Sequence, residues 1–184
     1  LISIGLGIGA GVFTTSFITI GALKNAFPNI AGFFNSLLQY SLFVYLIITV
    51  PDAFLKEIVF RGSITNELRK GMSIFLAIIV QGAIYACVLL YSDLPTRIYG
   101  FAGNVIFAGV FFLIGSLWGS ILANIFCSVT IYTLGNLLKN QPLVGDQTMY
   151  IALIISIIVV LLPFYFLAGR MKSKSKSAAT PVKG

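Results

Sequence analysis

Long apolar stretches, separated by short polar breaks, dominate this chain. Seven of these stretches come close to the roughly 20 residues that a helix needs to cross a bilayer. Their predicted bounds are Leu1–Leu23, Ile30–Val50, Ala53–Lys70, Met72–Tyr91, Ile98–Ile114, Leu117–Leu138 and Met149–Ala168. The pattern therefore predicts an all-α, polytopic transmembrane helical bundle with about seven membrane helices.

The third stretch is unlike the others because it carries charges within an otherwise apolar chain. Pro51 is expected to end the second helix, and Asp52 to cap the third helix through its side chain. Glu57 and Arg61 stand four residues apart, which places them on one helix face as an ion pair. The third helix is just long enough to cross the membrane. The alternative is six crossings, with residues 53–70 lying at the cytoplasmic surface.

The overall composition excludes a water-soluble domain. The 184 residues are 58% hydrophobic and 9% charged, whereas soluble domains contain about 25% charged residues. We expect one transmembrane domain over residues 1–169 and a basic, disordered tail over residues 170–184. Because the chain begins at Leu1 within an apolar run, we also expect further residues before it.

Charge asymmetry sets the expected orientation. With seven crossings, one side holds Lys24, Arg69, Lys70, the basic residues of Arg170–Lys176 and Lys183, and the other side holds Arg97 and Lys139. The positive-inside rule then places the C-terminal tail in the cytoplasm, where its lysines would meet anionic lipid headgroups. A juxtamembrane basic segment of this kind does not predict nucleic-acid binding.

Neither a metal site nor a cofactor is expected. The chain contains no histidine, the commonest metal ligand and general base. Its two cysteines, Cys87 and Cys127, each lie within an apolar run and are interpreted as small buried hydrophobic residues.

The first stretch contains glycines at alternate positions, namely Gly5, Gly7, Gly9 and Gly11. Pairs of small residues four apart let a neighbouring helix approach closely within a membrane. We interpret these glycines as helix-packing positions. A nucleotide-binding loop is not favoured, because no strand precedes them.

The stretch Lys56-Glu57-Ile58-Val59-Phe60-Arg61-Gly62 resembles the first motif of the CAAX prenyl protease and bacteriocin-processing family, also called the Abi or CPBP family. That motif contains two adjacent glutamates, three further residues, then arginine, usually followed by glycine. Glu57, Arg61 and Gly62 match it, whereas Lys56 stands in place of the first glutamate. The family consists of glutamic intramembrane endopeptidases and their relatives.

Two downstream motifs match in order and spacing, so the resemblance covers residues 30–138. The second family motif is phenylalanine, three residues, then histidine, and here Tyr85 and Leu89 occupy those positions. The third is histidine, three residues, then asparagine, and here Asn124 and Ser128 occupy them. The first glutamate and both histidines are thus replaced.

The resemblance implies a protease-like scaffold whose water-activating groups are missing. We therefore expect no proteolysis, and we expect Lys56, Glu57, Arg61, Asn124 and Ser128 to make polar contacts inside the bundle. The expected function is that of an accessory subunit, assembly factor or regulator that binds another integral membrane protein, in a bacterial-type plasma membrane. Alternatives are an endopeptidase with residual activity, or a bacteriocin self-immunity protein.

Overall fold

The computed structural model describes residues 1–88, 93–139 and 145–178. Within these ranges every regular element is a helix, which confirms the predicted all-α class. The elements are α1 (Ile2–Thr19), α2 (Gly21–Ala26), α3 (Pro28–Leu37), α4 (Leu42–Lys56), η1 (Glu57–Ile64), α5 (Thr65–Gly71), α6 (Ile74–Val88), α7 (Leu94–Ile114), α8 (Leu117–Lys139) and α9 (Asp146–Ala178).

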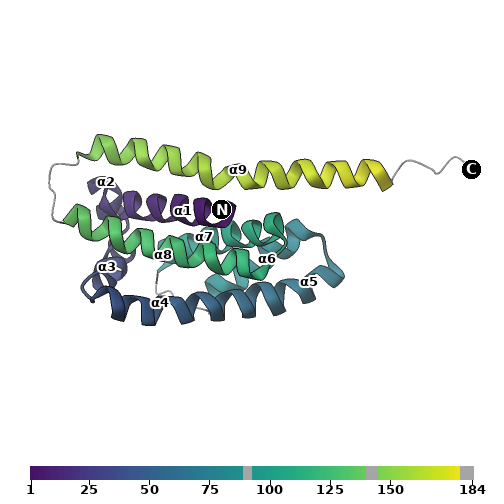
Figure 1. Ribbon diagram of the computed structural model, residues 1–184, viewed down its shortest axis with the longest axis horizontal. Coiled ribbons are helices and arrows are strands. Elements are labelled where there is room, and N and C mark those ends of the chain that lie inside the picture. Colours follow the sequence, from purple (N-terminus) through teal and green to yellow (C-terminus); the bar gives the residue numbers. More distant parts are fainter. Residues whose placement is uncertain (89–92, 140–144, 179–184) are drawn as a thin grey trace, which may run out of the picture.

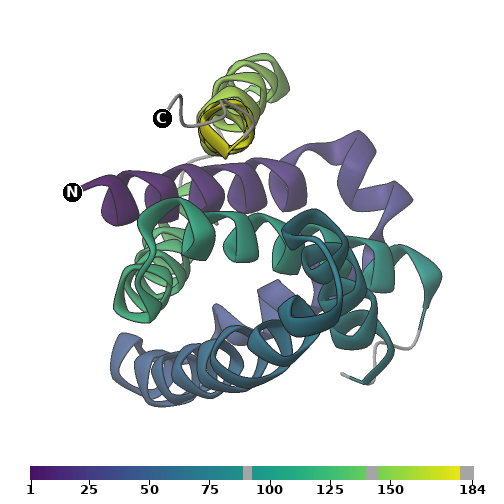
Figure 2. The same ribbon diagram turned by 90° about the vertical axis from the view of Figure 1, so that its right-hand side faces the viewer.

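The helices form a bundle in which α1 is central. Figure 1 shows α9 along one side of α1 and α8 along the other, with α4 on the far side of α8. Helices α6 and α7 pack against each other, and α7 also contacts both α8 and α9. The view along the bundle in Figure 2 shows α4 well separated from α1 and α9. Helix α8 is thus the element that joins the α1 side of the bundle to the α4 side.

Among the described residues, three helices are long and apolar enough to cross a membrane: Ile2–Thr19, Leu94–Ile114 and Leu117–Lys139. Two shorter apolar helices, Ile74–Val88 and Asp146–Leu162, accompany them. Apolar helices of this length satisfy all of their backbone groups internally, as a bilayer requires. The architecture is therefore that of an integral membrane helical bundle.

The glycines of α1 lie at its contacts with two neighbours. A Cβ on Gly7 would clash with the carbonyl oxygen of Ala123, and one on Gly11 would lie 2.7 Å from the carbonyl oxygen of Cys127. Gly9 faces α9, where a Cβ would lie 2.8 Å from Val159 Cγ1. Gly5 has no neighbouring atom within 4 Å of its Cβ position. Three of the four glycines therefore allow close helix approach, and Gly5 does not serve this purpose.

The prediction that Pro51 ends a helix is wrong, because Pro51 lies inside α4. The break falls earlier, between α3 and α4, where Ser41 caps α4 by accepting a hydrogen bond from the backbone N–H of Val44 at 3.5 Å. A proline removes one backbone hydrogen bond and crowds the preceding turn. The helix nevertheless continues past Pro51, with Tyr45 and Ala53 buried on either side of it in the sequence.

Helices α4, η1 and α5 follow one another without a break from Leu42 to Gly71. Both sequence interpretations treated residues 53–70 as a separate helix, whereas these residues belong to one longer helical path. The predicted count of seven membrane helices depended on a helix end at Pro51, and no helix ends there. The expected second crossing, Ile30–Val50, is instead divided between α3 and α4.

Two other helix ends differ from the sequence prediction. Helix α7 begins at Leu94, where the side chain of Asp93 accepts hydrogen bonds from the Thr96 backbone N–H at 3.2 Å and hydroxyl at 2.6 Å. Asp93 thus caps the helix ahead of the predicted start at Ile98. Helix α9 continues past Ala168 to Ala178, into the segment expected to be tail, and residues 179–184 lie outside the described ranges.

One part of the predicted charge distribution is also wrong. Lys24 and Lys139 line the same cavity, so they share one end of the bundle. The prediction that Lys24 and Lys139 lie on opposite sides of the membrane is wrong, because it counts one helix too many between them.

Helix α7 identifies the charges at the other end. Near its start, Tyr99 packs against Phe17 of α1, with ring centroids 5.9 Å apart. Near its end, Phe112 lies 5.1 Å below the guanidinium group of Arg69. Arg69 and its neighbour Lys70 therefore lie at the opposite end from Lys24.

Candidate functional site

The candidate site is built on η1, a π-helix that follows α4 directly. A π-helix hydrogen-bonds to the residue five positions earlier, and such turns are common at functional sites. Here both the backbone N–H and the hydroxyl of Thr65 donate to the carbonyl oxygen of Phe60, the hydroxyl at 2.5 Å. The wider turn lets the adjacent residues Phe60 and Arg61 both point into the protein, and both are buried.

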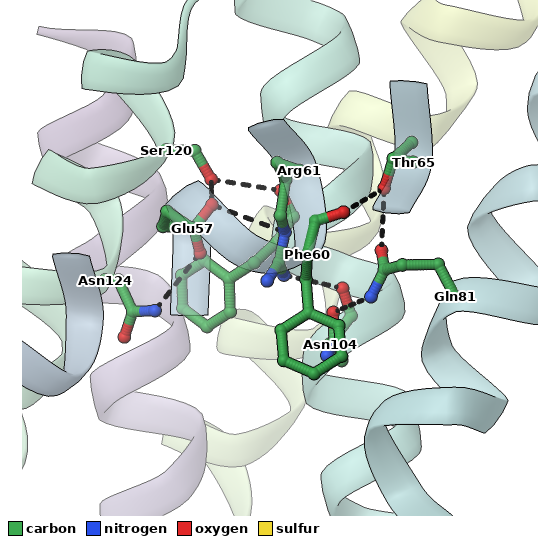
Figure 3. Close-up of polar contacts among 9 residues, drawn as sticks. Glu57, Phe60, Arg61, Thr65, Gln81, Asn104, Ser120 and Asn124 are labelled. Atoms are coloured by element: carbon green, nitrogen blue, oxygen red, sulfur yellow. Dashed lines mark hydrogen bonds and ion pairs between the residues drawn. The ribbon is translucent and has the colours of Figure 1, made fainter. Parts of the chain in front are cut away.

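Glu57 is the centre of the site, and its side chain has no exposed surface. Ser120 Oγ donates a short hydrogen bond to Glu57 Oε2, and Asn124 Nδ2 donates to Oε1 at 3.3 Å. Arg61 Nε lies 3.3 Å from Oε2, as an ion pair without the geometry of a hydrogen bond. Figure 3 shows all three groups converging on the carboxylate. Both carboxylate oxygens are therefore engaged.

Arg61 connects this carboxylate to α7. Its side chain is 2% exposed, and Nη2 donates to the carbonyl oxygen of Asn104 at 2.9 Å. An isolated guanidinium in this position would be very costly, because a buried charge needs a partner. Glu57 supplies the opposite charge and the α7 carbonyl supplies a further acceptor, so the buried guanidinium has a partner on each of two helical elements.

The network continues through side-chain amides to α6. Gln81 Nε2 donates to Asn104 Oδ1 at 2.5 Å, and the hydroxyl of Thr65 lies 3.4 Å from Gln81 Oε1. Thr65, Gln81 and Asn104 are all buried. Asn104 is the central residue of Leu94–Ile114, so this polar layer crosses the middle of an apolar span. Figure 3 shows the layer joining η1 and α5 to α6 and α7.

Lys56 does not join this network, although the sequence predicted that it would. Its ammonium group pairs with Asp52 at 2.5 Å, and its side chain is 27% exposed. The ammonium also lies 5.8 Å from the centre of the Tyr85 ring. Asp52 was expected to cap a helix, but because α4 runs through this point, its carboxylate is available to neutralise Lys56.

The other four replaced motif positions have different surroundings. Asn124 reaches Glu57, as described above. Ser128 does not: its hydroxyl donates to the Asn124 carbonyl oxygen at 3.1 Å, and its own carbonyl oxygen accepts from the Tyr45 hydroxyl at 3.0 Å. Tyr85 packs edge-on against Phe60, with ring centroids 5.1 Å apart. Leu89 lies outside the described residues.

The roles of four residues in this network were not predicted from the sequence: Ser120, Thr65, Gln81 and Asn104. One signal for Ser120 was present, because it stands four residues before Asn124 and therefore shares its helix face. Gln81 and Asn104 were visible as isolated amides in apolar runs, but no local pattern indicates that two such amides on different helices meet. In the described parts of the chain, no group of three or more His, Cys, Asp or Glu residues gathers that could hold a metal ion.

Comparison with known proteins gives one match. The family model described as "Type II CAAX prenyl endopeptidase Rce1-like" matches residues 38–130, about half of the chain. The matched region contains Glu57, Arg61, Ser120 and Asn124, and it begins just before α4. No curated protein and no solved structure matches the chain.

Proposed function

Because the chain belongs to the Rce1-like family of type II CAAX prenyl endopeptidases, we propose that it is a non-catalytic family member that acts by binding another integral membrane protein. The observation that carries this proposal is the state of Glu57. Its carboxylate is fully buried, and Ser120, Asn124 and Arg61 occupy both oxygens. A general base must reach the water that it activates, and Glu57 is arranged as a structural anion instead.

The positions around Glu57 support the same proposal. Lys56, which replaces the first family glutamate, is a cation paired with Asp52. The hydroxyl of Ser128 is used within its own helix. The chain contains no histidine, so the proton-accepting groups of the resembled family have no substitute at these positions.

A feature of α4 supports partner binding. The side chains of Asp52 and Lys56 are 51% and 27% exposed, and Leu55 and Ile58 beside them are exposed apolar residues. Asp52 lies ten residues after Leu42, about 15 Å along the helix at 1.5 Å per residue. Charges that face lipid inside a membrane are costly and normally find protein or water. A polar group of a partner helix is the occupant that we propose for this face.

A peptidase assay tests the first half of the proposal. Purified wild-type protein in mild detergent is incubated with a prenylated peptide that ends in a CAAX sequence, and Glu57→Gln serves as the matched control. We expect no cleavage above the control. A second variant restores the family pattern by Lys56→Glu, Leu89→His, Asn124→His and Ser128→Asn. Cleavage by the wild type that Glu57→Gln abolishes would establish the endopeptidase alternative.

Site-specific photo-crosslinking in native membranes tests the second half. A photoreactive residue replaces Leu55, which is 64% exposed on α4, or Ile154, which is 57% exposed on α9, as the matched control. We expect one discrete adduct from position 55, and its loss when Asp52→Leu and Lys56→Leu are combined. An adduct pattern that is equal at both positions, or unaffected by the double substitution, would contradict partner binding at this face.

A further inference from the structure

A second polar feature lies at the end of the bundle where α1 and α8 end. A cavity of about 180 Å³ is lined by Lys24, Lys139, Asn35 and Thr19, together with apolar residues. We propose that this cavity binds the phosphate group of an anionic glycerophospholipid. The proposal is independent of catalysis and of partner binding at α4.

The position of the cavity matches the level of lipid phosphates. The apolar span of α1 ends at Thr19 and that of α8 ends at Lys139, and both residues line the cavity. The ends of such spans mark the boundary between the hydrocarbon core and the headgroup layer. Basic pockets between membrane helices at this level are suited to anionic headgroups.

The charges of the cavity favour an anion. Lys24 and Lys139 are both exposed, and neither forms an ion pair with another residue in the described ranges. The acidic group placed nearby is Asp146, whose Oδ2 lies 3.6 Å from the Cβ position of Gly21. The two lysines that line the cavity outnumber this one carboxylate, so the local charge stays positive. Lysine ammonium groups bind phosphate as point charges, without requiring a fixed geometry.

The lining combines hydrogen-bond donors with an apolar base. The Thr19 hydroxyl donates to the carbonyl oxygen of Thr15 at 2.6 Å, so the amide of Asn35 and the two ammonium groups are the donors available to a ligand. Leu38 forms part of the base, and it approaches α8 closely because Gly135 has no side chain: a Cβ there would lie 2.6 Å from Leu38 Cδ1. A polar rim above an apolar base fits a phosphoglycerol group whose acyl chains continue along the bundle. The volume is too small for a whole lipid.

Native mass spectrometry of the full chain in detergent tests the proposal, with phosphatidylglycerol as the anionic probe and phosphatidylcholine as the zwitterionic one. We expect the wild type to retain phosphatidylglycerol preferentially. At about 1 kcal/mol for each lysine, each of Lys24→Gln and Lys139→Gln should weaken this binding roughly 5-fold, and the double variant roughly 30-fold. Lys24→Arg combined with Lys139→Arg keeps both charges and should retain the lipid.

The matched control removes two charges elsewhere, through Lys174→Gln and Lys176→Gln in the basic tail. This variant should keep its cavity-bound lipid. The proposal is overturned if the tail variant loses as much lipid as the cavity variant, or if both lipids bind the wild type equally well. It is also overturned if millimolar inorganic phosphate displaces the lipid completely, because the site would then prefer free phosphate. Melting temperatures of all variants in the same detergent show whether each variant is folded. If the cavity variant does not fold, the lipid preference of the wild type alone decides the outcome.

Discussion

Glu57 and Glu67 are both paired with a basic residue on the same helical path, yet their surroundings are opposite. Glu57 and Arg61 are 0% and 2% exposed, whereas Glu67 and Lys70 are 70% and 71% exposed. Desolvation makes a buried ion pair expensive to form and much more expensive to break. An exposed pair gains little, because water and salt screen it. The same residue type therefore holds helices together at position 57 and contributes almost nothing at position 67.

This contrast gives a prediction for the residue scale. Glu57→Leu should lower the free energy of unfolding by about 3–5 kcal/mol, because Arg61 would remain buried without an opposite charge. The variant should accumulate less in membranes and melt at a lower temperature in mild detergent. Glu67→Leu is the matched control, with an expected loss of about 0–1 kcal/mol.

Combining Glu57→Leu with Arg61→Leu separates the charge from the packing. Removing both partners leaves no unpaired charge, so the double variant should be more stable than Glu57→Leu alone. If Glu57→Leu showed wild-type abundance and melting temperature, the ion pair would not be holding the motif helix in place.

At the scale of the element, the glycines of α1 show how the position of a residue on a helix decides which neighbour it contacts. Its four glycines stand two residues apart, so nothing in the sequence distinguishes one of them from another. In the structure, Gly7 and Gly11 face the backbone of α8, Gly9 faces α9, and Gly5 faces open space. Only three of the four positions therefore meet a neighbouring helix, although the spacing of the glycines is uniform.

A pair of alanine substitutions on α1 tests this difference. Gly7→Ala should destabilise the protein by about 1–3 kcal/mol, because the new methyl group would press against the Ala123 carbonyl oxygen of α8. Gly5→Ala has room for its methyl group and should gain up to about 1 kcal/mol from improved helix propensity. Thermal melting of the two variants in the same detergent provides the measurement. Equal melting temperatures would show that α1 and α8 are not in close contact at Gly7.

At the scale of the whole molecule, the direction of each helix determines which charges share a membrane surface. Arg69 and Lys70 lie at one end of the bundle, and α9 runs toward that same end, so the basic segment Arg170–Lys176 follows it there. Lys24 and Lys139 lie at the other end. The end that carries Arg69, Lys70 and the basic segment remains the more positive one. The positive-inside rule therefore still favours a cytoplasmic C-terminus, although the corrected fold moves Lys24 to the opposite side.

Cysteine labelling in intact cells tests this orientation. In a background with Cys87→Ala and Cys127→Ala, the substitution Lys24→Cys should react with a membrane-impermeant maleimide added outside. Lys70→Cys should react only after the cells are permeabilised. The reverse pattern would place the C-terminus outside, and equal labelling of both positions without permeabilisation would contradict the corrected placement of Lys24.

Sequence alone determined the class of this protein, since the amount of apolar surface in 184 residues with 9% charge has no stable place in water. It also determined the Glu57–Arg61 pair, because a spacing of four residues on a helix fixes which side chains meet. Both properties depend on composition or on near neighbours in the chain.

Tertiary structure alone decided the rest. Pro51 lies inside a helix instead of ending one, and Ser120, Gln81 and Asn104 enter the site because three separate helices bring them there. Lys24 and Lys139 lie at the same end of the bundle because of the number of helices that run between them along the chain. Contacts between residues distant in the chain depend on the path of the whole backbone, and no local pattern carries that information.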